Sequence, residues 1–166
     1  MTKPELRLLV TGGTIDKYYD EISGKMVFSE QSYLPAMIEQ ARSKGSLALQ
    51  TLMLKDSLNM DDEDRAIVAN ACEEAEEDRI VITHGTDTMV ETGLAIKRLH
   101  LPKTIVLTGA MIPYTQGVRS DAQFNLGTAI AYAQVSPIGT YVAMNGQRFD
   151  IDNVRKDKPI GEFETK

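Results

Sequence analysis

The sequence predicts an α/β fold, namely a doubly wound, mainly parallel sheet flanked by helices. Short apolar segments typical of strands alternate along the chain with longer segments whose apolar residues recur at helical spacing. One expected strand contains the run Ile80-Val81-Ile82, which is continuous rather than alternating. Such a run is typical of a strand covered on both faces. Strands that alternate with helices form parallel sheets, and we expect right-handed connections between them.

The first half of the chain supplies two expected strands and two expected helices. The first strand is expected at residues 5–10, followed by the turn Thr11-Gly12-Gly13-Thr14 and a polar loop at residues 16–30. A helix at residues 33–42 and a strand at residues 47–54 come next. Residues 61–77 are expected to form an acidic helix, because their apolar residues fall on one stripe and their acidic start suits the helix dipole.

The second half continues the alternation. Strands are expected at residues 79–83, 104–107 and 141–144, and helices at residues 88–99 and 120–134. Thr88 with Glu91, and Ser120 with Gln123, have the spacing of capping boxes at the starts of these two helices. The remainder, from Asn145 onward, is polar and is expected to be irregular.

Composition limits the classes of partner. The 166 residues suit one domain, and 42% hydrophobic with 25% charged residues is ordinary for a soluble globular protein. Acidic residues outnumber basic ones by 24 to 18, and the net charge is -6. A net negative surface repels nucleic acid and anionic lipid, and no cluster of Lys and Arg reverses this locally. We therefore expect no nucleic-acid and no membrane partner.

The cysteine, the histidines and the apolar runs bear on compartment and metal binding. Cys72 is the only cysteine, so no intrachain disulfide is possible, and its place on the apolar side of a helix predicts a small buried hydrophobe. The run Leu8-Leu9-Val10 is too short for a signal peptide, and no segment is long enough to span a bilayer. The two histidines and the cysteine lie far apart and predict no metal site. We expect a cytoplasmic protein.

The turns after the expected strands hold most of the unusual residues. In parallel sheets ligands bind at the carboxyl ends of the strands. The two glycines before Thr14 allow a sharp turn and a close approach by a ligand. The Thr14 hydroxyl is a candidate nucleophile, although the same turn also fits a plain strand-to-loop connection or an anion cradle. Neither a dinucleotide-binding nor a phosphate-loop glycine pattern is present.

A second turn, residues 84–88, lies between a buried strand and a helix start. Thr88 is explained as a helix cap, which leaves Thr86 and Asp87 unexplained. Asp87 suits either a substrate ammonium or a lysine partner, and His84 fits an orienting or packing role better than a general base. A threonine nucleophile needs a base, and a desolvated lysine can serve. Candidate lysines lie in residues 155–158, a segment that by composition also fits a solvated charged tail.

These motifs together resemble the bacterial-type L-asparaginase family. Thr11-Gly12-Gly13-Thr14-Ile15 matches one family signature, and residues 82–89 match a second, which is long and specific. Four shorter stretches agree in order, so that the resemblance covers essentially the whole chain: Asp56-Ser57, residues 107–111, Phe124-Asn125-Leu126 and Met144-Asn145.

The resemblance implies a role for each matching position. Thr14 matches the primary nucleophile, and Thr86, Asp87 and Lys156 match the second threonine with its Asp and Lys partners. Ser57, with Thr86 and Asp87, matches the groups that hold the substrate's α-carboxylate and α-ammonium. The pocket for the amide and its oxyanion is expected around Gly13, Gly85 and Ala110. The resemblance implies no cofactor.

Three departures from the family pattern are visible. Family members are typically about twice as long, so residues 1–166 are expected to form a single catalytic domain, without the smaller C-terminal domain, and a homo-oligomer is expected to cover the site. Leu58 stands where many relatives have a polar residue that contacts the substrate. The tyrosine of the family's mobile loop aligns near Val27, and Tyr19 or Tyr18 is expected to replace it, with Tyr19 preferred.

The resemblance therefore predicts hydrolysis of a small amino-acid amide, L-asparagine, to L-aspartate and ammonia. Two other functions stay open. One is a binding module that senses an amino acid without turnover, which the missing domain and Leu58 favour and the intact nucleophile set disfavours. The other is an amidase for a related amide, such as glutamine or a modified asparagine.

Overall fold

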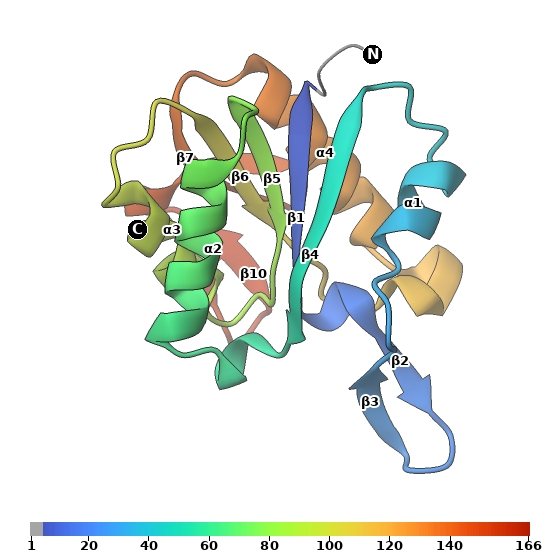
Figure 1. Cartoon of the computed structure of the whole chain (residues 1–166). Helices are drawn as coiled ribbons and strands as arrows, with labels where there is room; N and C mark the ends of the chain where they lie inside the picture. Colours follow the sequence, from blue (N-terminus) through green and yellow to red (C-terminus); the bar gives the residue numbers. More distant parts are fainter. Residues whose placement is uncertain (1–4) are drawn as a thin grey trace.

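The computed structural model describes residues 5–166, and a six-stranded sheet with helices on both faces forms its centre (Figure 1). The strand order is β4-β1-β5-β6-β7-β8. Five strands are parallel: β1 (Leu6–Gly12), β4 (Leu47–Lys55), β5 (Arg79–Thr83), β6 (Thr104–Thr108) and β7 (Gly139–Met144). The edge strand β8 (Gln147–Asp150) runs antiparallel to β7. The predicted fold class, a doubly wound and mainly parallel sheet, is confirmed.

Two apolar cores lie on the two faces of the sheet. In β1 the register places Leu8 opposite Leu49 of β4 and Val81 of β5. Leu8 and Val81 belong to the core under α1 (Leu34–Gln40) and α4 (Ala122–Val135). The next residues along these strands, Leu9 and Ile82, belong to the core under α2 (Asp62–Glu74) and α3 (Met89–Lys97). Side chains alternate between faces along a strand, so continuous apolar runs feed both cores.

One crossover has the unexpected hand. The connections through α2, α3 and α4 all step in the same direction across the sheet, but α2 and α3 cover one face and α4 covers the other. A connection that steps in the same direction with its helix on the opposite face has the opposite hand. The connection β6-α4-β7 is therefore left-handed (Figure 1). The expectation of right-handed connections is therefore wrong for this one. The seven-residue α1 is too short to cover its face of the sheet alone, and α4 covers the rest of the same face.

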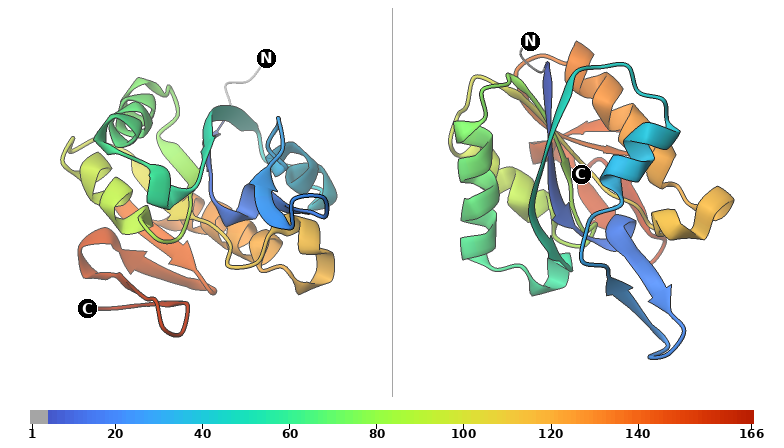
Figure 2. Two further views of the ribbon diagram at one scale, coloured as in Figure 1. Left: turned by 90° about the horizontal axis from the view of Figure 1, so that it is seen from below. Right: turned by 45° about the vertical axis from the view of Figure 1, so that its right-hand side comes forward.

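Residues 16–30, expected to be a polar loop, contain a β-hairpin. Strands β2 (Lys17–Asp20) and β3 (Lys25–Phe28) pair antiparallel over four residues each. The hairpin projects from the body of the molecule beyond the carboxyl end of β4 (Figure 2). Polarity hid the strands, because side chains on both faces of an exposed hairpin stay near solvent and show no apolar alternation.

The segment after Asn145 is ordered, which corrects the expectation of an irregular remainder. It forms β8, the 3₁₀ turn η4 (Ile151–Asn153), β9 (Arg155–Asp157) and β10 (Glu162–Glu164), and the last two strands pair with each other. Ile151, Val154 and Phe163 are buried in the core that α2 and α3 cover. These three isolated apolar residues anchor a segment whose average composition is polar.

The helix starts differ from the sequence prediction. The Thr88–Glu91 and Ser120–Gln123 capping boxes are wrong: α3 and α4 have no side-chain hydrogen bond at their N-caps. A capping box forms instead at α2, where the Asp61 side chain accepts from the Asp64 backbone N–H and the Asp64 side chain accepts from that of Asp61. Within residues 5–166, no helix is both long and apolar enough to cross a membrane.

Candidate active site

Four turns meet at the carboxyl edge of the sheet, where the sequence predicts the site (Figure 2, left). The turn of Gly13 and Thr14 follows β1, and Ser57 opens the 3₁₀ turn η2 (Ser57–Asn59) after β4. The turn with Thr86 follows β5, and Gly109-Ala110 follows β6. Parallel strands place all their carboxyl ends at one edge, so residues almost a hundred positions apart in the sequence become neighbours.

The turns after β1, β4 and β5 touch through glycines. A Cβ added to Gly13 would lie 2.4 Å from the backbone nitrogen of Gly85, and one added to Gly85 would lie 2.6 Å from the Ser57 hydroxyl oxygen. Gly13 also has φ +81°, a conformation that residues with a side chain rarely adopt. The predicted oxyanion-pocket residues Gly13 and Gly85 are thus packed together, with Thr14 half-buried beside them.

Lys156 joins the two residues of the turn after β5. Its Nζ donates hydrogen bonds to Thr86 Oγ1 and to Asp87 Oδ1, both at 2.8 Å. The Lys156 side chain is 9% exposed and that of Asp87 is 33% exposed. Strand β9 positions Lys156, and its partner in the β9–β10 ladder is the buried Phe163. Lys156 therefore does not lie in a solvated tail, and it bridges a hydroxyl and a carboxylate.

Ser57 is held in place by Thr88. The Thr88 hydroxyl donates to the Ser57 carbonyl oxygen at 2.9 Å, and the Thr88 backbone N–H donates to the Ser57 hydroxyl at 3.4 Å. Thr88 thus fixes the Ser57 turn rather than capping a helix with its side chain. Leu58, the departure from the family pattern, is 65% exposed and packs into neither core.

Asn125 fixes the Gly109-Ala110 turn, a role that sequence reasoning missed. This fully buried amide donates from Nδ2 to the Gly109 carbonyl at 2.9 Å and to Asp121 Oδ2 at 2.8 Å. Its Oδ1 accepts from the Asn145 N–H at 3.3 Å, so one side chain joins the ends of β6 and β7. In the sequence, Asn125 is a polar residue on the stripe of this helix that otherwise carries apolar residues such as Ala122 and Leu126, and this position could have pointed to its role.

His84 is a packing residue. It is fully buried, and Nδ1 donates to the Gly85 carbonyl oxygen at 2.7 Å. Nε2 lies 2.8 Å from the Thr92 hydroxyl. Burial lowers the pKa of the imidazole to about 4. At neutral pH the ring is therefore uncharged, and Nε2 accepts from Thr92.

The expected tyrosine lies apart from the Thr86–Asp87–Lys156 group. Tyr19 lies in β2, its side chain is 57% exposed, and its hydroxyl sits over the hairpin turn near Gly24. Tyr18, the alternative, pairs with Val27 in the same hairpin and is half-buried. Among the described residues, no hydrogen bond joins either tyrosine to Thr14, Thr86 or Lys156.

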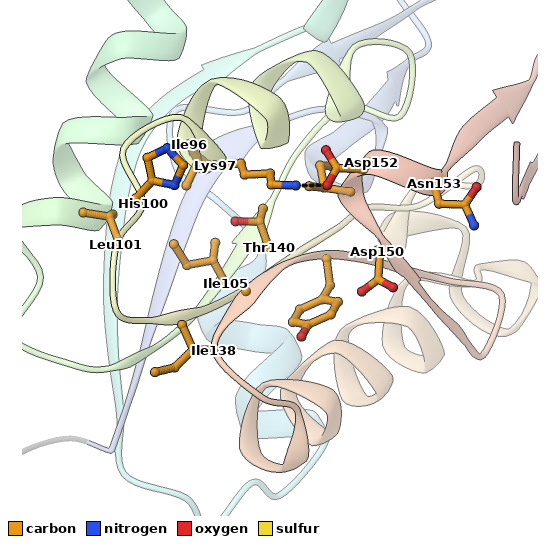
Figure 3. Close-up of a pocket in the computed structure, with 13 residues that line it drawn as sticks. Ile96, Lys97, His100, Leu101, Ile105, Ile138, Thr140, Asp150, Asp152 and Asn153 are labelled. Atoms are coloured by element: carbon orange, nitrogen blue, oxygen red, sulfur yellow. Dashed lines mark ion pairs between the residues drawn. The ribbon is translucent and has the colours of Figure 1, made fainter.

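A cavity of about 570 Å³ lies at the other end of the molecule, near the amino ends of β6 and β7 (Figure 3). Ile96, Ile105 and Thr140 line it, and an exposed ion pair between Lys97 and Asp152 crosses it. None of the predicted site residues lines this cavity. Within residues 5–166, no cluster of three or more His, Cys, Asp or Glu side chains is placed to hold a metal ion.

Comparison with known proteins identifies relatives of this arrangement. Residues 5–159 match the family model described as "Asparaginase, N-terminal". An L-asparaginase of Thermococcus kodakarensis is 36% identical over 143 residues, which cover 84% of this chain and 43% of that protein. One of the subunits of the glutamyl-tRNA(Gln) amidotransferase of Methanococcus maripaludis is 32% identical over 154 residues, covering 87% of this chain and 36% of that protein.

Solved structures agree. The thermostable L-asparaginase from Thermococcus kodakarensis superposes with a TM-score of 0.83 at 33% identity, covering 96% of this chain and 50% of that one. A probable cytoplasmic L-asparaginase from Campylobacter jejuni gives a TM-score of 0.78 at 29% identity, covering 98% and 53%. The chain thus spans from about a third to about half of the length of these relatives.

Proposed function

Since the chain belongs to the asparaginase N-terminal family, we propose that it hydrolyses L-asparagine to L-aspartate and ammonia with Thr14 as the nucleophile. The observation that carries the proposal is the position of Lys156, whose amine lies 2.8 Å from both the Thr86 hydroxyl and the Asp87 carboxylate. A lysine shared between a hydroxyl and a carboxylate, at the ligand-binding edge of the sheet, is a group suited to moving a proton.

The proposed reaction has two steps. The Thr14 hydroxyl oxygen attacks the side-chain amide carbon, and the hydroxyl proton passes through the base to the departing nitrogen, which leaves as ammonia. Water then attacks the acyl-enzyme, releases aspartate and returns a proton to Thr14. Backbone N–H groups of the Gly13–Thr14 and Gly85–Thr86 turns are proposed to stabilise the oxyanion, with Ala110 shaping the amide pocket.

The two candidates for the base are Tyr19 and the Thr86–Lys156–Asp87 group. The second is favoured, because its three side chains are already hydrogen-bonded to one another. Tyr19 is exposed on the hairpin and acts, under this proposal, only in a conformation that brings the hairpin to Thr14.

The proposed substrate is a zwitterion. Asp87 is assigned to the α-ammonium, and Ser57 with Thr86 to the α-carboxylate. Blocking the α-amino group removes the charge that Asp87 recognises, so N-acetyl-asparagine should be a poor substrate. Hydrolysis of N-acetyl-asparagine at the same kcat/KM as asparagine would instead favour an amidase for a modified amide.

A direct assay tests the function. Purified protein is incubated with asparagine or with glutamine, and ammonia and the amino-acid product are measured. Release from asparagine supports the proposal. Release of ammonia from glutamine alone would support an amidase for a related amide. The similarity to a subunit of an amidotransferase is the reason to include glutamine in the assay. Binding of asparagine by calorimetry without ammonia release would instead establish a binding module.

The chain is proposed to fold as one catalytic domain. The core under α2 and α3 includes Leu9 near one end of the chain and Phe163 near the other, so both ends contribute to one unit. Residues 1–166 expressed alone should unfold in urea in a single transition that is the same by fluorescence and circular dichroism. Two separate transitions would contradict a single cooperative domain.

A homo-oligomer is proposed for the assembly. Five exposed apolar side chains lie on segments around the carboxyl edge, where a second copy would cover them: Met111, Ile112, Val118, Phe124 and Ile160. Light scattering at micromolar concentration should give at least twice the mass of one chain. A monomer that binds asparagine tightly would contradict the proposal, because the domain would then close its own site.

A cytoplasmic location is also proposed, in line with the similarity to the probable cytoplasmic L-asparaginase from Campylobacter jejuni. Fractionation of cells that express the chain should recover it with cytoplasmic markers. Recovery with periplasmic markers would contradict this location.

A further inference from the structure

The β2–β3 hairpin depends on its base for a fixed position. It follows directly after the Thr14–Asp16 turn, and all residues from 21 to 26 are exposed. An isolated two-stranded hairpin is at best marginally stable in water. Contacts at the feet of the hairpin therefore decide how it lies relative to the candidate site.

Lys17 fastens the first foot. Its Nζ donates to Asp56 Oδ2, and this ammonium also lies 5.3 Å from the centre of the Phe28 ring in the opposite strand. The Lys17 carbonyl oxygen accepts from the Thr115 hydroxyl at 3.0 Å. The Lys17 side chain is only 15% exposed, so its ammonium is partly desolvated and its ion pair is stronger than one on the open surface.

The second foot is fastened separately. The buried carboxylate of Asp16 accepts from the Ser32 hydroxyl at 2.9 Å and from the Tyr33 backbone N–H at 2.7 Å. This contact closes the hairpin onto the start of α1 and does not reach Ser57. Within residues 5–166, the Lys17–Asp56 pair is the only ion pair between the hairpin and the turn that carries Ser57.

Asp56 passes this contact on to Ser57. Its Oδ2 accepts from Lys17, and its Oδ1 accepts from the Leu58 backbone N–H at 3.0 Å. The carboxylate therefore holds the residues on both sides of Ser57 in the chain. The hydrogen bond from Lys17 lowers the pKa of Asp56, which keeps the carboxylate charged at neutral pH. Thr88 holds Ser57 from its other side.

We propose that Lys17 is a positioning residue for the candidate site: its ion pair with Asp56 holds the hairpin and the Ser57 turn in one arrangement that favours substrate binding. The kinetic part of this inference rests on the proposed amidase function, whereas its structural part does not. The Thr86–Asp87–Lys156 group is held by other contacts, so loss of Lys17 should weaken binding and spare the chemical step.

Hydrogen exchange tests the structural part without any activity. Lys17→Met should raise exchange of the amides in residues 17–28 by about tenfold, because the hairpin is then docked for a smaller fraction of time. Lys17→Arg should restore slow exchange. Lys25→Met is the matched control, since Lys25 is exposed in the same hairpin and makes no ion pair with any residue from 5 to 166. Unchanged exchange in Lys17→Met would overturn the proposal.

Asp56→Asn and the double variant complete the test. Each single variant should speed exchange equally, and the double variant should be no faster than either, because all three lose the same ion pair. Additive effects would overturn the pairing. In the ammonia assay KM should rise about tenfold in Lys17→Met with kcat within about twofold of wild type. A fall in kcat at unchanged KM would also count against the proposal.

The two proposals can fail independently. A wild-type protein that does not release ammonia from asparagine refutes the amidase function, while the exchange results still decide whether Lys17 fastens the hairpin. Conversely, an active wild type with identical exchange in Lys17→Met leaves the function standing and refutes the role of Lys17.

Discussion

Gly13 and Gly85 meet backbone against backbone: a Cβ added to Gly13 would lie 2.4 Å from the Gly85 nitrogen. This contact brings the turn that carries Thr14 against the turn that carries Thr86. A side chain at either position would separate the two threonines. The relative position of the two hydroxyls therefore depends on the absence of side chains next to them.

Gly13→Ala should be strongly destabilising and inactivating. The added methyl clashes with Gly85, and the φ of +81° at Gly13 is unfavourable for alanine, so the free energy of unfolding should fall by about 3 kcal/mol. Gly127→Ala is the control, because a Cβ there meets nothing within 4 Å and helix propensity should add up to about 1 kcal/mol. Urea unfolding measures both. Equal stabilities for the two variants would contradict the packing argument.

Thr14→Val and Thr86→Val should each reduce kcat/KM by about a thousandfold or more, since the hydroxyl is lost while the volume is kept. Thr128→Val is the matched control: the Thr128 hydroxyl donates to the Phe124 carbonyl at 2.7 Å on α4, away from the site. Circular dichroism should show an unchanged fold for all three variants. Wild-type turnover by Thr14→Val would remove Thr14 from the mechanism.

Lys156→Met should lose nearly as much activity as Thr86→Val, because the amine that joins Thr86 and Asp87 is gone. Stability should change little, by about 1 kcal/mol, since Asp87 is partly exposed and can be hydrated. The control is Lys158→Met, two residues along the chain and exposed. If both variants lose the same amount of activity, the effect is one of general charge and the assignment of Lys156 is wrong.

His84 should make the protein acid-sensitive. Its folded pKa is about 4, against 6.5 for the ordinary imidazole, so the unfolded chain binds more protons between these two pH values. The uncharged His84 therefore adds about 3 kcal/mol to the free energy of unfolding. This stabilisation is complete above pH 6.5 and is lost as the pH falls toward 4. Urea unfolding from about pH 7 to about pH 4 measures the loss.

Two histidine variants test this pH effect: His84→Gln removes the buried imidazole, and His100→Gln is the matched control. His84→Gln should remove most of the loss on acidification, although the variant is less stable throughout because two buried hydrogen bonds change. His100→Gln, which alters the exposed histidine, should keep the wild-type dependence. An equal dependence in His84→Gln and wild type would show that buried carboxylates, not His84, cause the acid sensitivity.

The sequence by itself determined the order along the chain of the five parallel strands of the central sheet and of the helices between them. Continuous apolar runs such as Ile80-Val81-Ile82 have few alternatives to a covered strand, and the turns after such strands hold Thr14, Ser57 and Thr86. Because parallel strands end at one edge, the sequence also predicted where these turns, which form the candidate site, come together. These features are local in the sequence, and a local pattern is sufficient to predict them.

Tertiary structure decided the features that depend on distant partners. The hand of the β6-α4-β7 crossover depends on which face of the sheet lacks a helix, and a periodic pattern in α4 is the same for either face. By composition, the segment of Lys156 fits a solvated charged tail. In the structure, Phe163 and Val154 anchor this segment in the core. The Lys17–Asp56 pair joins residues 39 positions apart, and neither charge is unusual in its own segment. In each case the deciding energy comes from burial or pairing with another part of the chain, which no single segment contains.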